Sequence, residues 1–109
     1  MNIGIVCYPT YGGSGVLATE LGKSLAARGH NIHFITYSRP IRLGHFVQNV
    51  LFHEVRLSDY PLFEYPPYES ALTSTMVDVG RYQNIDLFHV HYAIPHASAA
   101  VMARNILAG

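Results

Sequence analysis

A glycine-rich segment near the N-terminus is the first candidate for chemistry. Gly12, Gly13 and Gly15 follow a short apolar run and precede a predicted helix. Glycine has no Cβ, so its backbone N–H can approach a ligand closely, and the start of a helix adds free N–H groups and the positive end of the helix dipole. The segment therefore predicts an anion site, for phosphate or carboxylate, with Gly13, Ser14 and Gly15 as contacts. The alternative is a tight turn in which the glycines serve packing only.

The same segment also matches, over residues 13–18, the G-x-G-x-x-A pattern of dinucleotide-binding proteins. Residues 8–11 separate the predicted strand from these glycines, and the next predicted strand does not end in the acid that would hold a ribose. Arg39, close to the end of that strand, leaves an NADP-dependent oxidoreductase open as an alternative. No lysine follows the glycines as a P-loop requires, which excludes a P-loop nucleotidase.

Histidines gather at a second place along the chain, at His89, His91 and His96. The period of two along a strand puts His89 and His91 on the same face. Three histidines suggest zinc, but no cysteine or carboxylate stands at a metal-like spacing, so we expect no metal. We expect His89 to be a core histidine and His91, at the end of its strand, to be functional. His33 and His53 fall inside predicted strands and are expected to be structural.

Alternating strand and helix signals position these two segments. Short apolar or β-branched runs predict strands, and apolar residues at helical spacing predict helices. The predicted strands cover residues 3–7, 32–37, 50–57 and 86–90, and the predicted helices cover residues 15–28, 69–83 and 97–108. Ser14 is the expected N-cap of the first helix, and Leu17, Leu21 and Leu25 are its expected buried stripe.

This order of elements predicts a Rossmann-like α/β fold, with a mostly parallel sheet flanked by helices. Ligands of such sheets bind beyond the carboxyl ends of the strands. The glycine-rich segment follows the first strand and residues 91–96 follow the fourth, so both segments are predicted to open onto the same edge. Residues 58–68 contain Pro61, Pro66 and Pro67 and are predicted to form a loop.

Composition narrows the class of protein. The chain has 109 residues, half of them hydrophobic, and a formal net charge of zero, which fits one globular domain. A single lysine and no basic block argue against binding nucleic acid or an anionic membrane. The lone Cys7 excludes an intrachain disulfide and fits a reducing compartment. No signal peptide and no apolar run near the ~20 residues of a membrane span are present, so we predict a cytoplasmic protein.

The segments that carry a family resemblance span nearly the whole chain. They are C-Y-P-x-x-G-G-S-G at residues 7–15, A-T-E-L-G-K at 18–23, H-F-I-T at 33–36, F-H-E-V at 52–55, Y-P-P-Y at 65–68 and H-V-H-Y-A-I-P-H-A at 89–97. Together they resemble the family 4 retaining glycosyltransferases of the GT-B fold, and within that family the branch that acts in bacillithiol biosynthesis. The first and last segments are specific in combination, whereas each alone is a weak signal.

The resemblance implies transfer of N-acetylglucosamine from UDP-N-acetylglucosamine to the hydroxyl of L-malate with retention of configuration. It also implies that residues 1–109 are part of the N-terminal, acceptor-side domain, that the donor-binding C-terminal domain is absent from this chain, and that the fragment alone is inactive.

Residue roles follow from the same resemblance. His91 is expected to touch the donor sugar, Tyr92 to line the acceptor pocket, and Gly13, Ser14 and Gly15 to contact acceptor or diphosphate. No metal or other cofactor is expected, because the UDP-sugar is a substrate. Members of the family often dimerise, so the full-length protein is a candidate homodimer. A bare Rossmann-like module that binds an anion without chemistry stays open as the alternative.

Overall fold

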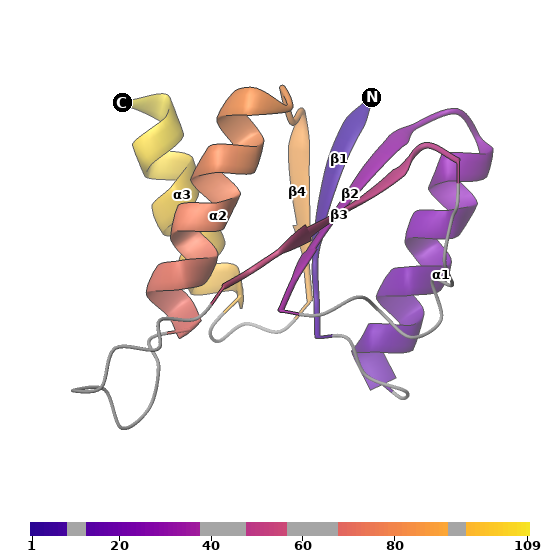
Figure 1. The fold of residues 1–109 in the computed structure, drawn as a ribbon, viewed down its shortest axis with the longest axis horizontal. Coiled ribbons are helices and arrows are strands. Elements are labelled where there is room, and N and C mark those ends of the chain that lie inside the picture. Colours follow the sequence, from indigo (N-terminus) through magenta and orange to yellow (C-terminus); the bar gives the residue numbers. More distant parts are fainter. Residues whose placement is uncertain (9–12, 38–47, 57–67, 92–95) are drawn as a thin grey trace.

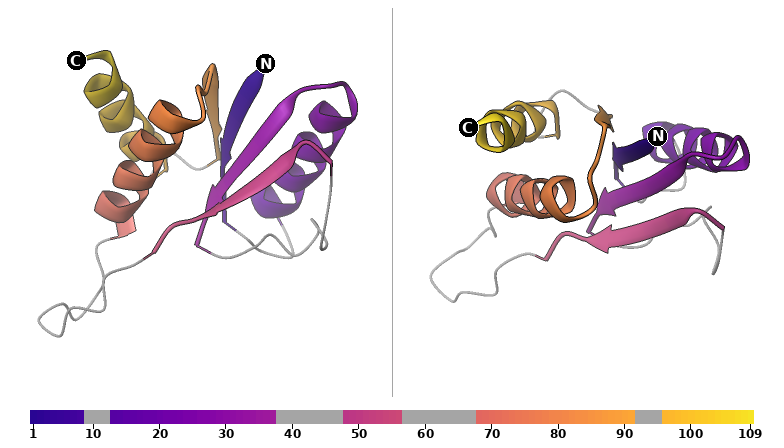
Figure 2. Two further views of the ribbon diagram at one scale, coloured as in Figure 1. Left: turned by 45° about the horizontal axis from the view of Figure 1, so that its top comes forward. Right: turned by 90° about the horizontal axis from the view of Figure 1, so that it is seen from above.

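A computed structural model describes residues 1–8, 13–37, 48–56, 68–91 and 96–109. The elements follow one another as β1 (Asn2–Val6), α1 (Gly13–Ala27), β2 (Asn31–Thr36), β3 (Val50–Glu54), α2 (Tyr68–Tyr82), β4 (Leu87–Val90) and α3 (Ser98–Ala108). They form three layers, with α1 on one face of the sheet and α2 and α3 on the other (Figures 1 and 2). The predicted Rossmann-like α/β class is confirmed.

The sheet places β1 between β2 and β4. Its strand order is β3-β2-β1-β4, and each of the three pairings is parallel. The chain therefore builds outward from β1 to β2 and β3, and then crosses back to add β4 on the other side of β1. This reversal creates a topological switch point between β1 and β4, the place where open α/β sheets bind ligands. The carboxyl ends of the strands lie at the bottom of Figure 1, where α1 also begins.

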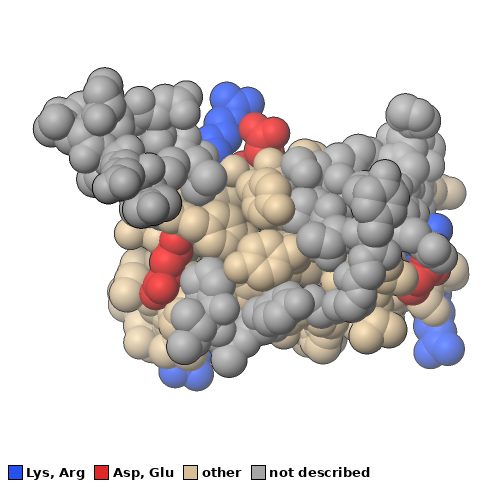
Figure 3. All heavy atoms as spheres, turned by 90° about the horizontal axis from the view of Figure 1, so that it is seen from below, with Lys and Arg blue, Asp and Glu red and all other residues tan. Residues whose placement is uncertain are grey.

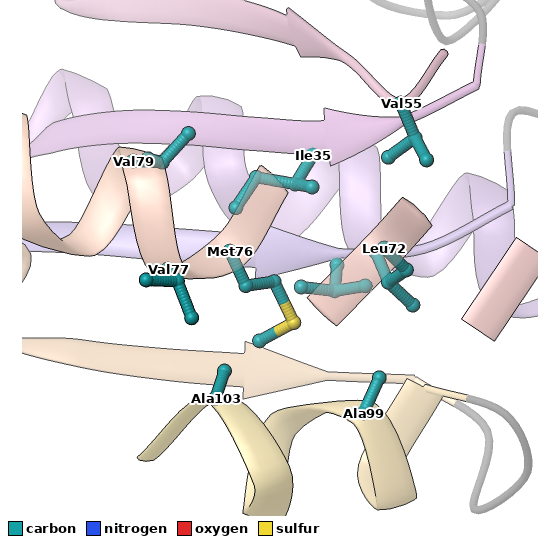
Figure 4. Packing of buried hydrophobic residues seen from close by; sticks show 9 residues of the cluster. Ile35, Val55, Leu72, Met76, Val77, Val79, Ala99 and Ala103 are labelled. Atoms are coloured by element: carbon teal, nitrogen blue, oxygen red, sulfur yellow. The ribbon is translucent and has the colours of Figure 1, made fainter. Parts of the chain in front are cut away.

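Two apolar clusters hold the helices to the two faces of the sheet. The buried residues on the α2 and α3 side are Val6, Ile35, Val55, Leu72, Met76, Val77, Val79, Ala99 and Ala103 (Figure 4). Those on the α1 side are Ile3, Ile5, Cys7, Ala18, Ala26, Ile32 and Phe34. Because β1 and β2 are covered on both faces, their sequences are mostly apolar and do not alternate between apolar and polar residues.

Mainly small residues, and not Leu17 or Leu21, attach α1 to the sheet. Leu17 is 68% exposed and Leu21 is 36% exposed, so the predicted buried stripe is wrong at these two positions, whereas Leu25 is half-buried against the α1-side cluster. The buried positions of α1 are Gly15, Ala18, Thr19, Gly22 and Ala26. Phe34 of β2 fills the space that a larger residue on α1 would need: a Cβ at position 22 would lie 2.4 Å from Phe34 Cζ. The helix therefore packs closely on the sheet.

The other element bounds lie close to the predicted ones, with β3 as the exception. The alternation of residues 50–57 predicts a strand of that length, whereas β3 ends at Glu54. β3 occupies one edge of the sheet, so it is paired along one side only, by β2. Most of the predicted loop at residues 58–68 lies outside the described residues, and α2 begins at Tyr68.

The packing of α1 generates the first prediction. Gly22→Val in the full-length protein forces Phe34, which is fully buried, out of its place, and overpacking of this kind costs about 1–3 kcal/mol. Ser24→Val, an exposed position on the same helix, introduces the same side chain and should stay within about 0.5 kcal/mol of wild type. Urea unfolding of both variants checks this expectation. Equal stabilities would mean that α1 does not pack through Gly22.

Candidate functional site

The exits of β1 and β4 converge at the switch point, as predicted. The two strands pair from Ile3 opposite Leu87 to Val6 opposite Val90. Just beyond the last pair, the His91 N–H donates a hydrogen bond to the Val6 carbonyl, with an N···O distance of 3.0 Å. The segment before α1 and the segment before α3 therefore leave the sheet from adjacent strands at one edge.

The N-terminal turn of α1 lies at this edge. The helix begins at Gly13, so Ser14 sits inside the first turn, and its predicted position as the N-cap is wrong. The first turn contains no acidic residue, and the first N–H groups of any helix have no partner within the helix. Such a helix start suits an anion. Gly12 and the loop before it lie outside the described residues.

His91 follows the end of β4 at the same edge of the sheet. Its ring packs edge-on against His89, with centroids 4.8 Å apart and an interplanar angle of 74°, which confirms that the two side chains share a face. Its Nε2 is buried and has no hydrogen-bond partner among the residues that the structure describes. Burial lowers the pKa of His91, and the nearby His89 and His96 lower it further. The ring is therefore neutral, with one buried nitrogen available to a polar partner.

The prediction that His89 is a core histidine is wrong. Its side chain is exposed, so it is not a core histidine. β4 is an edge strand of the described sheet, and α1 covers mainly the neighbouring strands (Figure 2). The face of β4 that carries Leu87 and His89 is therefore open within the described part of the chain, and Leu87 is also exposed.

An aromatic cluster that the sequence did not predict lies beside the same edge. Tyr8, just beyond β1, lies with its ring centroid 6.3 Å from that of Tyr37 and 6.2 Å from that of Tyr68. The His96 ring is nearer to Tyr8, with a centroid distance of 4.5 Å. The sequence did hold a signal for this cluster: a tyrosine lies just past the end of each of two neighbouring parallel strands.

Charged side chains are sparse where the strands end. In Figure 3, which looks onto this edge, the coloured Lys, Arg, Asp and Glu side chains lie toward the sides of the molecule. Arg56, beyond β3, is exposed and pairs with Glu54 at an N···O distance of 3.3 Å. Arg39 and Arg42 lie outside the described residues. Within the described part, this edge thus offers mainly uncharged polar groups: backbone N–H groups, histidine rings and the hydroxyls of tyrosines and Thr36.

Two hollows lie away from the switch point between β1 and β4. One, of about 490 Å³, is lined by residues of β3 and α2, including His53 and Asp78. The other, of about 500 Å³, is lined by residues of β4 and α3, including Phe88 and Arg104. Both flank the outer strands of the sheet and neither includes the first turn of α1 or His91. The convergence of backbone donors and a neutral histidine at the switch point makes that edge the better candidate site.

Metal binding and nucleophilic catalysis find little support in the described residues. Among residues 1–8, 13–37, 48–56, 68–91 and 96–109, no group of three or more His, Cys, Asp or Glu side chains could hold a metal ion. Burial raises the pKa of the Cys7 thiol to about 11, which makes it a poor nucleophile. No helix in this part of the chain is long and apolar enough to cross a membrane.

The fold and the position of the site define a class. A parallel Rossmann-like sheet with its candidate site at the switch point is the fold expected of the N-terminal domain of a GT-B glycosyltransferase. The model of Glycosyltransferase Family 4 matches residues 11–108. The chain belongs to this family, and its membership argues against an NADP-dependent oxidoreductase.

Two relatives agree with this assignment. The chain is 54% identical over 107 residues to N-acetyl-alpha-D-glucosaminyl L-malate synthase of Bacillus anthracis, a match that covers 98% of this chain and 28% of the relative. The chain thus spans about a quarter of the length of that relative. A crystal structure of a glycosyltransferase from Rickettsia africae ESF-5 has the same fold, with a TM-score of 0.67 at 18% identity, over 96% of this chain and 27% of that one.

Two pairs of histidines, His33 with His53 and His91 with His96, share one electrostatic property. His33 and His53 lie in β2 and β3 as expected, with His33 Nδ1 2.9 Å from His53 Nε2. Burial lowers the pKa of both, and the charge on His53 adds to the effect at His33. Burial likewise lowers the pKa of His91 and His96. The folded protein therefore favours neutral histidines at both places.

The sign of this effect gives the second prediction. Below about pH 6.5, the ordinary histidine pKa, the unfolded chain binds more protons than the folded one. The contribution of these histidines to stability is therefore constant well above that pH, and it declines as the pH falls toward the lowered pKa values. Urea unfolding of the full-length protein over a pH series measures the decline. In His33→Phe/His53→Phe the slope should be shallower, and an unchanged slope in this variant would remove the pair from the explanation.

Proposed function

We propose that the full-length protein is a retaining glycosyltransferase that moves N-acetylglucosamine from UDP-N-acetylglucosamine to L-malate in bacillithiol biosynthesis. The observation that carries the substrate assignment is the 54% identity, over 98% of this chain, to a relative named for that product. The geometry fits this assignment, because L-malate is a small dianion and UDP is a diphosphate, and both suit the start of α1 at the switch point.

The reaction requires one bond to form and one to break at the anomeric carbon. The malate hydroxyl oxygen bonds to that carbon while the bond from the carbon to the UDP oxygen breaks. The hydroxyl proton passes to the departing diphosphate on the same face of the sugar, so the configuration is retained. Protein groups at the site then have to orient the two substrates and stabilise the charge that develops between them.

Residues of this chain would orient the substrates and stabilise part of the developing charge. The N–H groups of Gly13, Ser14 and Gly15 would bind a malate carboxylate or the diphosphate. The unpartnered Nε2 of His91 would make a polar contact with the donor sugar. Tyr92, which lies outside the described residues, would line the acceptor pocket. Residues 1–109 form part of the acceptor-side domain in this proposal, and the fragment alone is inactive because the donor-binding domain lies elsewhere in the full-length protein.

The cellular location that we propose rests on the cysteine content of the chain. The single cysteine, Cys7, is buried and unpaired, as is usual for proteins of reducing compartments. We place the full-length enzyme in the cytoplasm for this reason.

The third prediction tests the substrates. The full-length protein should release UDP from UDP-N-acetylglucosamine only when L-malate is present. Succinate, which has both carboxylates but no hydroxyl, is the matched control and should give no turnover. Coupled detection of UDP with each acceptor in turn makes the measurement. Turnover with another acceptor, such as inositol phosphate, but none with L-malate would refute the malate assignment.

The fourth prediction tests His91. A contact that strengthens as charge develops in the transition state lowers kcat when it is lost, so His91→Ala in the full-length enzyme should reduce kcat by about 10². KM should change much less. His89→Ala removes the neighbouring exposed ring from the same strand face and should cost much less activity. If the effects of the two variants were reversed, the role assigned to His91 would belong to His89.

A further inference from the structure

His96 joins segments that are far apart in the sequence. Its side chain is fully buried and lies just before α3. Nδ1 is 2.5 Å from the His91 carbonyl oxygen, and Nε2 is 3.0 Å from the Tyr68 hydroxyl at the start of α2. Its ring also packs on Tyr8, beyond β1. One side chain therefore contacts the exits of β1 and β4 and the start of α2.

The two hydrogen-bond partners of His96 indicate which of its ring nitrogens carries the proton. A carbonyl oxygen only accepts, so Nδ1 must carry the hydrogen that it donates to His91. Burial lowers the pKa of His96, although the bond to the His91 backbone opposes this effect, so the ring is neutral and Nε2 is an acceptor. Burial raises the pKa of Tyr68, with Tyr8 adding to the rise, so Tyr68 keeps its proton and donates it to Nε2.

The surroundings leave His96 little freedom. Tyr8 packs on the His96 ring and also against Tyr37 and Tyr68. Tyr68 packs against both Tyr8 and Tyr37, with its ring centroid 6.2 Å from that of Tyr37. A ring with both nitrogens bonded and one face against a tyrosine has a single orientation that satisfies every polar atom.

The hydrogen bond from His96 helps to fix the backbone of His91. Its N–H is bonded to Val6 and its carbonyl to His96, so the backbone is fixed on both sides of its Cα. The ring is left with a buried Nε2 that no described residue satisfies. An arrangement that fixes the backbone and leaves the ring nitrogen unpaired suits a side chain that must meet a ligand in one orientation.

We propose that His96, oriented by Tyr68, is a positioning residue that holds His91 for its contact with the donor sugar. The activity part of this proposal rests on the proposed function, whereas the tautomer of His96 and its effect on His91 do not. His96 does not touch the substrate in this proposal and acts through the His91 backbone.

Two substitutions at position 96 separate positioning from packing. His96→Phe keeps an aromatic ring but removes the donor to His91. His96→Asn is smaller and packs less well, yet its amide N–H stands close to the place of Nδ1 and can still donate to the carbonyl. In the full-length enzyme, His96→Phe should lower kcat by about 10–10² with the KM for the UDP-sugar nearly unchanged. His96→Asn should recover most of that loss.

A double-mutant cycle tests whether the effect passes through His91. In the His91→Ala background, His96→Phe should cause little further loss of kcat, because coupled residues are not additive. The proposal would be overturned if the losses of kcat from His91→Ala and His96→Phe multiplied in the double variant. It would also be overturned if His96→Asn were as impaired as His96→Phe, and His96 would then be a packing residue. Thermal unfolding of each variant shows that it is folded at the assay temperature.

Nitrogen NMR of the histidine rings gives a reading that needs no substrate. In the full-length protein, His96 should show a protonated Nδ1 and a bare Nε2, and the ring signals of His91 should shift in His96→Phe and return in His96→Asn. A proton on Nε2 alone, or unshifted His91 signals, would overturn the proposal even in an active enzyme. If the wild type fails to use L-malate but these NMR results hold, the malate assignment is wrong and the positioning of His91 stands.

Discussion

The parallel pairing of β4 with β1, on the side opposite β2, is the constraint on which the candidate site depends. It creates the switch point, and it brings residues from the two ends of the described chain to one edge. The register is specific: Val6 lies opposite Val90, and the His91 N–H bonds to the Val6 carbonyl. A slip of one residue would turn every side chain of β4 to the other face of the sheet. Phe88 would then leave the core, and the His91 side chain would turn to the face of the sheet that carries α2 and α3.

A second constraint is the distance between α1 and the sheet. The helix buries small residues, including Gly22, and the ring of Phe34 occupies the space above that position. Close packing of this kind sets where the N-terminal turn of α1 stands relative to the end of β1. Leu17 and Leu21 are left exposed as a result, because the closely packed interface has no volume for them. Gly15 and Gly22 thus serve the close packing of the helix on the sheet.

The polar groups that the structure describes at the site are mostly neutral. Burial keeps His91 and His96 unprotonated, so each ring offers one donor and one acceptor. In His96 both are used within the protein, by His91 and Tyr68. In His91 the buried Nε2 is unused within the described residues. The two rings therefore differ in what they can do: His96 joins parts of the protein, whereas His91 has a nitrogen that can bind a ligand.

The sequence by itself determined the order of the elements, the strand that each candidate segment follows, and the shared face of His89 and His91. These depend on backbone periodicity and on the conformations of glycine and proline, which are local properties. Only the tertiary structure decided which face of α1 is buried, that His89 is exposed, and that Tyr68 meets His96 across 28 positions of sequence. Burial and hydrogen-bond partners depend on surfaces contributed by distant segments, and a pattern read along one segment contains no information about the shape or volume of the segment that will cover it.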